Sequence, residues 1–240
     1  MDIYRIRTPE KLLAGNTYPG RGIIVGLTPD GTRAAAAYFI MGRSENSRNR
    51  IFVERNEEVF TEPCDPSKVV DPSLIIYAAI RQRGDQLIVT NGDQTDTIYN
   101  ALGQGMSLSR ALERRAFEPD EPNFTPRISA LLTFGRGSFR YEMSILKSAD
   151  AEGSACNRFT FSYTPVPGLG HFLHTYQSDG NPLPAFQGEP ERVTICDDPD
   201  SMTEQIWQSL NADNRISLYV RYVDLETGHM DNRLINKYER

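Results

Sequence analysis

Side chains suited to chemistry are most concentrated between residues 117 and 127. This stretch combines carboxylates with amide, hydroxyl and guanidinium groups, on Glu118, Asp120, Glu121, Asn123, Thr125 and Arg127. Crowded carboxylates can differ in pKa, so that one of them acts as an acid or base near neutral pH. A neighbouring arginine can orient a carboxylate or bind phosphate. The competing interpretation is a solvated acidic loop in which Arg127 forms a surface ion pair.

A second polar stretch runs from Asn91 to Thr97, where a predicted strand meets a predicted helix. Free backbone N–H groups at the start of a helix can hold an anion or the polar edge of a ring. The competing interpretation is an Asn-Gly turn followed by an ordinary helix cap.

A third group of candidates comprises three arginines and one tyrosine. Arg43, Arg48 and Arg50 lie in a polar loop and could bind phosphate, because a guanidinium offers two parallel hydrogen bonds. Exposed arginines are also common on ordinary protein surfaces. Tyr77 lies in an aliphatic run, and its hydroxyl needs a partner if it is buried. The alternative is a core tyrosine whose tip reaches the surface.

These residues must be positioned by strands that the apolar pattern predicts. Residues 21–27 and 34–41 are expected to form a hairpin around Asp30-Gly31, and another short apolar run covers residues 51–53. The run from Leu74 to Thr90 predicts a second hairpin around Gly84-Asp85, although its first seven residues could also form a helix.

The rest of the chain mixes helices and strands. Helices are expected at about residues 95–102 and from residue 107 onward. Four strand-like segments follow, at residues 128–134, 139–146, 159–163 and 172–176. The spacing Ser201-x-x-Glu204 predicts a capped helix, and a final strand covers residues 216–223. This order predicts an α+β protein with two antiparallel sheets covered by helices, in one domain over residues 18–240 after an appendage of residues 1–17.

The composition excludes several classes of partner. A formal charge of −6 and a pI near 5.2 lack the cationic footprint of a nucleic-acid-binding protein. No stretch approaches the roughly 20 apolar residues that span a bilayer, and the first residues lack the apolar core of a signal peptide. We therefore expect a cytoplasmic protein with no nucleic-acid or membrane partner.

The metal-binding residue types are not spaced as ligands. Cys64, Cys156 and Cys196 are widely separated, which predicts neither a disulfide framework nor a zinc site. His171 and His174 would point to opposite faces of a strand, so that one metal ion could not readily bind both. Motifs typical of serine hydrolases, P-loop NTPases and dinucleotide-binding proteins are also missing. We expect neither a metal nor a cofactor.

Five blocks in this order resemble the stand-alone, archaeal-type IMP cyclohydrolase family. The blocks are Tyr18–Arg21, Arg43–Arg50, Tyr77 before Gly84-Asp85, Asn91–Thr97 and Asp120–Arg127. The resemblance is clear over residues 18–146 and loose beyond them. The chain differs from the family in residues 1–17, in single-residue spacing changes near Tyr77 and Asn123, and in a longer second half.

The resemblance implies an activity, a fold and a set of site residues. Members of this family close a formamido-imidazole-carboxamide ribonucleotide to inosine monophosphate with loss of water, the last step of de novo purine synthesis. The implied fold is a four-layer αββα sandwich like that of the N-terminal-nucleophile hydrolases, without their self-cleaving nucleophile, and the implied assembly is a homo-oligomer. The resemblance assigns Arg50, Tyr77 and Glu118 to the reactive centre. It assigns substrate contacts to Arg21, Arg48, Asn91, Gly92, Asp96, Asn123, Thr125 and Arg127.

The implied chemistry is compatible with these residue types. Ring closure joins two groups of one molecule, so rigid positioning can supply much of the rate enhancement without a cofactor. We expect Glu118 to transfer a proton and Tyr77 or Arg50 to stabilise the developing oxyanion. One alternative is a non-catalytic relative that binds a purine ribonucleotide for regulation. A weaker alternative is an amide-bond hydrolase on the same fold.

Overall fold

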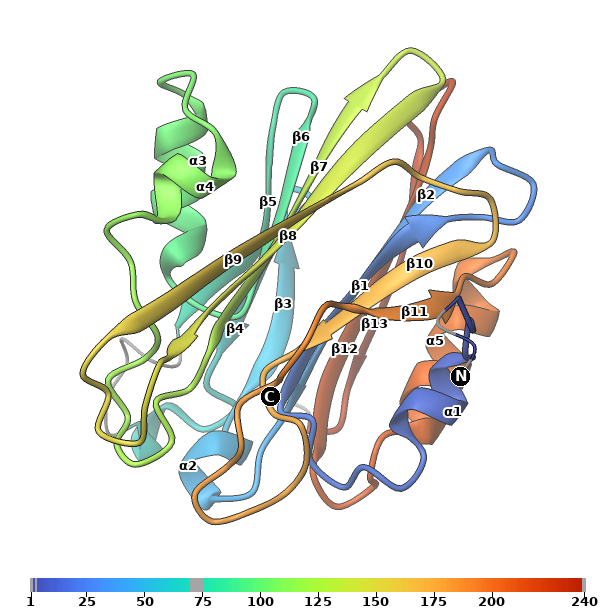
Figure 1. The fold of residues 1–240 in the computed structure, drawn as a ribbon. Coiled ribbons are helices and arrows are strands. Elements are labelled where there is room, and N and C mark those ends of the chain that lie inside the picture. Colours follow the sequence, from blue (N-terminus) through green and yellow to red (C-terminus); the bar gives the residue numbers. More distant parts are fainter. Residues whose placement is uncertain (1, 3, 70–75, 239–240) are drawn as a thin grey trace.

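The chain folds into two antiparallel sheets packed face to face. A computed structural model describes residues 2, 4–69 and 76–238 of the 240-residue chain. The first sheet has six strands in the order β11-β10-β1-β2-β12-β13 (Figure 1). Their bounds are β1 Arg21–Leu27, β2 Arg33–Met41, β10 Leu169–His174, β11 Glu191–Thr194, β12 Arg215–Asp224 and β13 Met230–Asn236.

The second sheet has seven strands, in the order in which they follow one another along the chain. These are β3 Ile51–Arg55, β4 Glu58–Glu62, β5 Tyr77–Arg83, β6 Gln86–Thr90, β7 Arg127–Gly135, β8 Ser138–Ser148 and β9 Cys156–Tyr163. Short turns connect β3 with β4, β5 with β6 and β7 with β8, and all neighbouring strands of this sheet pair antiparallel. At the β5–β6 turn Gly84 has a φ of 57°, a conformation that glycine adopts without strain.

Helices cover the outer face of each sheet (Figure 1). α3 and α4 pack on the second sheet through a cluster that includes Ile88, Ile98 and Leu131. α1 and α5 pack on the first sheet, where Met202 and Ile206 of α5 join its outer face. The helix bounds are α1 Pro9–Leu13, α2 Glu45–Arg48, α3 Gln94–Leu102, α4 Leu108–Leu112 and α5 Pro199–Ser209, and a short 3-10 turn covers Pro66–Lys68.

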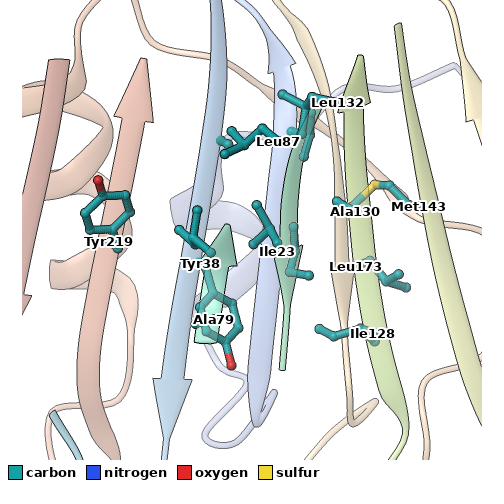
Figure 2. Packing of buried hydrophobic residues seen from close by; sticks show 14 of the residues in the cluster. Ile23, Tyr38, Ala79, Leu87, Ile128, Ala130, Leu132, Met143, Leu173 and Tyr219 are labelled. Atoms are coloured by element: carbon teal, nitrogen blue, oxygen red, sulfur yellow. The ribbon is translucent and has the colours of Figure 1, made fainter. Parts of the chain in front are cut away.

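Alternation along the strands builds the core between the sheets. Ile23 of β1 and Tyr38 of β2 face the second sheet, whereas Ile24 and Phe39 belong to the outer cluster under the helices. Since both faces of the first sheet are covered, its central strands are buried at almost every position. Figure 2 shows the inner face, where side chains of the two sheets meet.

The predicted α+β class with two antiparallel sheets is confirmed, as are the hairpins of β1 with β2 and of β5 with β6. Leu74 and Ile75 of the second predicted hairpin lie outside the described residues. The prediction that the strand at residues 216–223 is the last one was wrong, because β13 follows it and pairs with β12. The predicted start of the last helix was also wrong, because Asp198 caps α5 and Pro199 is its first residue.

Several elements carried too little signal to be predicted. β4 and β11 are short, and α2 lies within the polar loop that precedes β3. The alternation of only four or five residues barely differs from chance, so such strands are recognised only by their pairing. No helix among the described residues combines the length and the apolar character needed to cross a membrane.

Residues before the first strand lie against the first sheet. α1 contacts α5, and Arg7 forms a backbone bridge with Val193 of β11. The Arg7 guanidinium also forms an ion pair with Glu191. The division of the chain into residues 1–17 and 18–240 stays a prediction.

Candidate active site

A cavity of about 300 Å³ lies beside the first residue of β1 and the residue that precedes β3. The segment around α2, the loop of residues 118–125 and the segment of residues 176–183 complete its lining. Arg21 of the first sheet therefore meets Arg50 and Thr125, which lie just before β3 and β7 of the second sheet. Five of the residues that the family resemblance assigned to the site line it, namely Arg21, Arg50, Glu118, Asn123 and Thr125, as do the further candidates Arg43 and Asp120.

Two arginines and one glutamate form the charged centre of the cavity. Arg21, Arg50 and Glu118 are only 7%, 6% and 5% exposed. The Nε atoms of both arginines are buried without a hydrogen-bond partner among the described residues. Burial lowers the pKa of Arg50, and the neighbouring charge of Arg21 lowers it further. Two buried guanidinium groups with unsatisfied donors are suited to bind an anion or a polarised carbonyl oxygen.

Burial also controls the state of Glu118. It raises the pKa of this carboxyl, while the charges of Arg21 and Arg127 lower it and that of Asp120 raises it. The backbone N–H of Glu118 donates to the carbonyl oxygen of Thr125 at 2.9 Å, which closes the loop. A buried carboxyl of raised pKa beside two arginines has the properties of a general acid or base.

Hydrogen bonds hold the 118–125 loop in place. Oδ1 of Asp120 accepts from the backbone N–H of Thr125 at 2.6 Å, and the Thr125 hydroxyl donates to Oδ2. The same hydroxyl contacts the Tyr176 hydroxyl. Oδ1 of Asn123 accepts from the backbone N–H of Leu183 at 3.1 Å. Two predicted substrate contacts, Asn123 and Thr125, thus also tie this loop to the segment of residues 176–183.

Tyr77 lies close to Arg21 and Arg50 but does not itself line the cavity. It is 6% exposed, and its hydroxyl is 2.8 Å from that of Tyr38. The Tyr77 hydroxyl is therefore buried and hydrogen-bonded, and it does not reach the surface. Arg21 and Arg50 are close enough to favour a negative charge on the Tyr77 oxygen.

The arginines of the 42–50 loop take different directions. Arg43 lines the cavity, where it pairs with Asp179 and lies 4.9 Å from the ring centre of Tyr18. Arg48 donates to the carbonyl oxygen of Gly42 at 3.1 Å and to Oδ1 of Asn214 at 3.2 Å. Arg48 borders a neighbouring pocket, and its contact with substrate stays a prediction.

The stretch that begins at Asn91 forms a wall next to the cavity. A Cβ atom on Gly92 would lie 2.5 Å from Nη1 of Arg127 and 3.5 Å from Oε1 of Glu118, so a larger residue there would displace the Arg127 guanidinium. Arg127 is buried and pairs at 2.7 Å with Asp93, whose side chain is 49% exposed, so the ion pair joins a buried guanidinium to a carboxylate at the surface. Asp93 precedes α3 but makes no side-chain cap with it.

Asp96 is not part of this wall. Its side chain is 63% exposed and pairs with Arg81 at 2.8 Å. The structure thus brings Gly92 and Arg127 next to Glu118 and leaves Asp96 apart. Substrate contacts by all three residues remain predictions.

Both the nitrogen and the oxygen of the Asn91 side-chain amide form hydrogen bonds within the protein. Its Nδ2 donates to the carbonyl oxygen of Pro126 at 2.9 Å. Its Oδ1 accepts from the backbone N–H of Ile128 at 2.8 Å and from Gln94 at 3.0 Å. At 1% exposure, Asn91 keeps one N–H that is not used in these bonds. The predicted substrate contact could use only that group.

Replacing Asn91 with alanine is therefore expected to lower the free energy of unfolding by about 1–3 kcal/mol, because buried partners of the amide lose their hydrogen bonds. Urea unfolding of the variant measures this loss. Asn100→Ala is the matched control, since Asn100 is exposed on α3 and its replacement should leave stability unchanged. Equal stability of the two variants would contradict the structural role of Asn91.

Sequence reasoning missed several residues of the cavity. Tyr18 and Tyr176 both line it, and their rings stack with centres 5.9 Å apart and an interplanar angle of 18°. Tyr18 stands in the first of the five sequence blocks, which was a usable signal. Tyr176 and Leu183 lie beyond the stretch with clear family resemblance, and nothing local in the sequence marks them.

Comparison with known proteins identifies the family. The family model described as "IMP cyclohydrolase-like protein" matches residues 18–228, which is most of the chain. The chain belongs to this family. The resemblance found in the five sequence blocks is thereby confirmed.

Archaeal family members are similar over large parts of the chain. The IMP cyclohydrolase of Methanopyrus kandleri is 32% identical over 182 residues, which cover 71% of this chain and 89% of that protein. The IMP cyclohydrolase of Methanothrix thermoacetophila is 32% identical over 120 residues, which cover 48% and 58%. The IMP cyclohydrolase of Methanococcus aeolicus is 27% identical over 165 residues, covering 67% and 74%.

Proposed function

We propose that this protein is an IMP cyclohydrolase, which closes 5-formamido-1-(5-phosphoribosyl)imidazole-4-carboxamide to inosine monophosphate with loss of water. The observation that carries the proposal is the buried set of Arg21, Arg50 and Glu118 around one cavity, in a member of the IMP cyclohydrolase-like family. The substrate is anionic and carries amide and formyl oxygens, which match unsatisfied guanidinium donors.

The reaction needs positioning and proton transfer. The carboxamide nitrogen attacks the formyl carbon, the formyl oxygen becomes a hydroxyl, and this hydroxyl leaves as water when the ring becomes aromatic. Because both groups belong to one molecule, a rigid site that holds them at attack distance lowers the barrier. Glu118 takes a proton from the attacking carboxamide nitrogen and passes it to the former formyl oxygen, which becomes the hydroxyl. It then takes the proton that the formamido nitrogen loses and gives it to this hydroxyl, which leaves as water. Arg50 and Tyr77 stabilise the oxygen while it carries negative charge.

The rest of the lining binds the nucleotide. Arg21, Asn123 and Thr125 have side chains at the cavity, and Gly92 and Arg127 support the wall beside Glu118. We also keep Arg48, Asn91 and Asp96 as proposed substrate contacts. The charge of Arg43 at the cavity adds a further attraction for the ribonucleotide.

The test is turnover of the formamido ribonucleotide by the purified protein, followed by absorbance and by chromatography of the product. The expected result is formation of inosine monophosphate without added metal or cofactor. Arg136→Ala, in the turn between β7 and β8, should turn over substrate at the wild-type rate. Tight binding of the ribonucleotide with no product would refute the enzyme and favour a non-catalytic relative.

We also propose a role in purine biosynthesis, a location in the cytoplasm and assembly into a homo-oligomer. The observed layers of helix, sheet, sheet and helix also support the likeness to the fold of N-terminal-nucleophile hydrolases. No nucleic acid or membrane takes part in the proposed reaction.

The pH dependence of turnover is expected to respond to Asp120. Glu118 must be ionised to accept the first proton, so kcat/KM should rise with pH through the pKa of Glu118. Burial and the charge of Asp120 raise this pKa. Asp120→Asn removes the repelling charge, and the rising part of the pH profile should move to lower pH.

The control for this prediction is Glu121→Gln, which removes an exposed carboxylate from the same loop. Its profile should coincide with that of the wild type, since an exposed charge is screened by water and salt. A profile of Asp120→Asn that stays in place or moves to higher pH would exclude this action of Asp120 on Glu118.

A further inference from the structure

Two buried tyrosines from opposite sheets meet close to the arginines of the cavity. Tyr38 lies in the middle of β2 in the first sheet, and Tyr77 is the first residue of β5 in the second. Their hydroxyl oxygens are 2.8 Å apart. Tyr38 is 0% exposed and has no atom in the lining of the cavity. Among the described residues, neither hydroxyl has a second hydrogen-bond partner.

The Tyr38 hydroxyl is not needed to fill the core. The ring of Tyr38 packs 5.4 Å from that of Phe52, in a cluster that is otherwise almost entirely apolar. A phenylalanine would make the same ring contacts, and burial of a hydroxyl there costs free energy unless it is hydrogen-bonded. The role of this hydroxyl is therefore its hydrogen bond with the Tyr77 oxygen.

The surroundings of the two hydroxyls indicate which tyrosine donates. Tyr77 faces Arg50, Arg21, Glu118 and Tyr38. Burial raises the pKa of Tyr77, but both arginines oppose this effect. Burial also raises the pKa of Tyr38, and the same two arginines oppose this effect there. The Tyr38 hydroxyl is fully buried and has the Tyr77 oxygen as its one partner among the described residues, so its hydrogen is satisfied only if Tyr38 donates and Tyr77 accepts.

We propose that Tyr38 is a positioning residue that acts through Tyr77: its hydroxyl donates to the Tyr77 oxygen and leaves the Tyr77 hydrogen available to the reacting centre. The inference rests on the proposed function of the cavity. A hydroxyl has one hydrogen, so an oxygen that accepts from one side is free to donate on another. Accepting a hydrogen bond also makes that hydroxyl a stronger donor. No proton leaves either tyrosine in this arrangement.

A double-mutant cycle tests whether Tyr38 acts through Tyr77. Tyr38→Phe should lower kcat by about 10-fold, the upper range for loss of one neutral hydrogen bond, with KM changed less than about twofold. In the Tyr77→Phe background, the same Tyr38→Phe change should cause no further loss of kcat. Equal losses in both backgrounds, or no loss in the wild-type background, would overturn the proposal.

A second measurement does not depend on turnover. NMR of protein labelled with ¹³C at the tyrosine Cζ follows ionisation of each ring, and Tyr77→Phe identifies the Tyr77 signal. Without the donor at position 38, ionisation of Tyr77 should move to higher pH. An unchanged or lower ionisation pH would overturn the donor assignment. If the wild-type protein does not convert the ribonucleotide, the proposed function fails, while this titration still tests the pairing.

Tyr222→Phe is the matched control for stability. Tyr222 is fully buried in the same sheet, and its hydroxyl donates to the carbonyl oxygen of Cys196 at 3.0 Å, on the face away from the second sheet. This variant loses one buried hydrogen bond far from the reacting centre. Its kcat should equal that of the wild type, so a fall in kcat for both phenylalanine variants would overturn a specific role of Tyr38.

Discussion

Replacing Glu118 with glutamine is expected to lower kcat by about 10²–10⁴-fold, the range for loss of a general acid or base. Glutamine has the same shape but cannot take a proton from the substrate and return it. Glu118 is 5% exposed and faces Arg21 and Arg50, so few water molecules could replace it as a proton carrier. Steady-state kinetics with the formamido ribonucleotide measure the loss.

Binding should respond differently from turnover in this variant. Glu118→Gln removes a negative charge that lies beside two buried guanidinium groups, so an anionic ligand should bind at least as tightly as to the wild type. Glu113→Gln is the control, because Glu113 is exposed and forms its ion pair with Arg110 of the same helix end. Full turnover by Glu118→Gln would remove Glu118 from the proposed mechanism.

Replacing Arg50 with alanine is expected to lower kcat by about 10²–10³-fold, as observed when a donor to a developing oxyanion is lost. Arg50 is buried, its Nε atom has no partner among the described residues, and Tyr77 lies close to it. Bound substrate would supply an oxygen acceptor for this unpaired donor. Single-turnover kinetics separate this loss from an effect on binding.

Stability measurements distinguish loss of chemistry from loss of structure. Arg21 and Arg50 repel each other, and this repulsion contributes to the lowered pKa of Arg50. Removal of Arg50 relieves the repulsion, so thermal unfolding of Arg50→Ala should not occur at a lower temperature than that of the wild type. Arg110→Ala removes an exposed arginine from α4 and should change neither kcat nor the temperature of thermal unfolding. An inactive Arg50→Ala protein that unfolds early would contradict the proposed catalytic role.

The charged centre of the site was largely predictable. Arg50 and Glu118 stand in or beside sequence blocks that resemble the family, and both line the cavity together with Arg21. Their residue types already indicated binding of an anionic substrate. Whether each residue performs the proposed step depends on the experiments above.

Directions of side chains within the blocks were not predictable. Arg43 and Arg48 occur in the same loop, but only Arg43 lines the cavity, because α2 turns Arg48 toward Gly42 and Asn214. Asn91 is also held by its own chain. The direction of such a side chain depends on hydrogen-bond partners that can be distant in sequence, and a local sequence pattern does not identify them.

The sequence by itself determined the class of fold, the two hairpins at its centre and the family. These properties follow from local signals, namely period-2 alternation, turn residues and ordered polar blocks. Only the tertiary structure decided that β10 joins β1 while β7, β8 and β9 stay in the other sheet. It alone brought Tyr176 to the cavity and Tyr38 to Tyr77. The physical reason is that strand pairing and sheet packing are long-range contacts, whose free energy comes from burial and hydrogen bonds between segments that no local pattern relates.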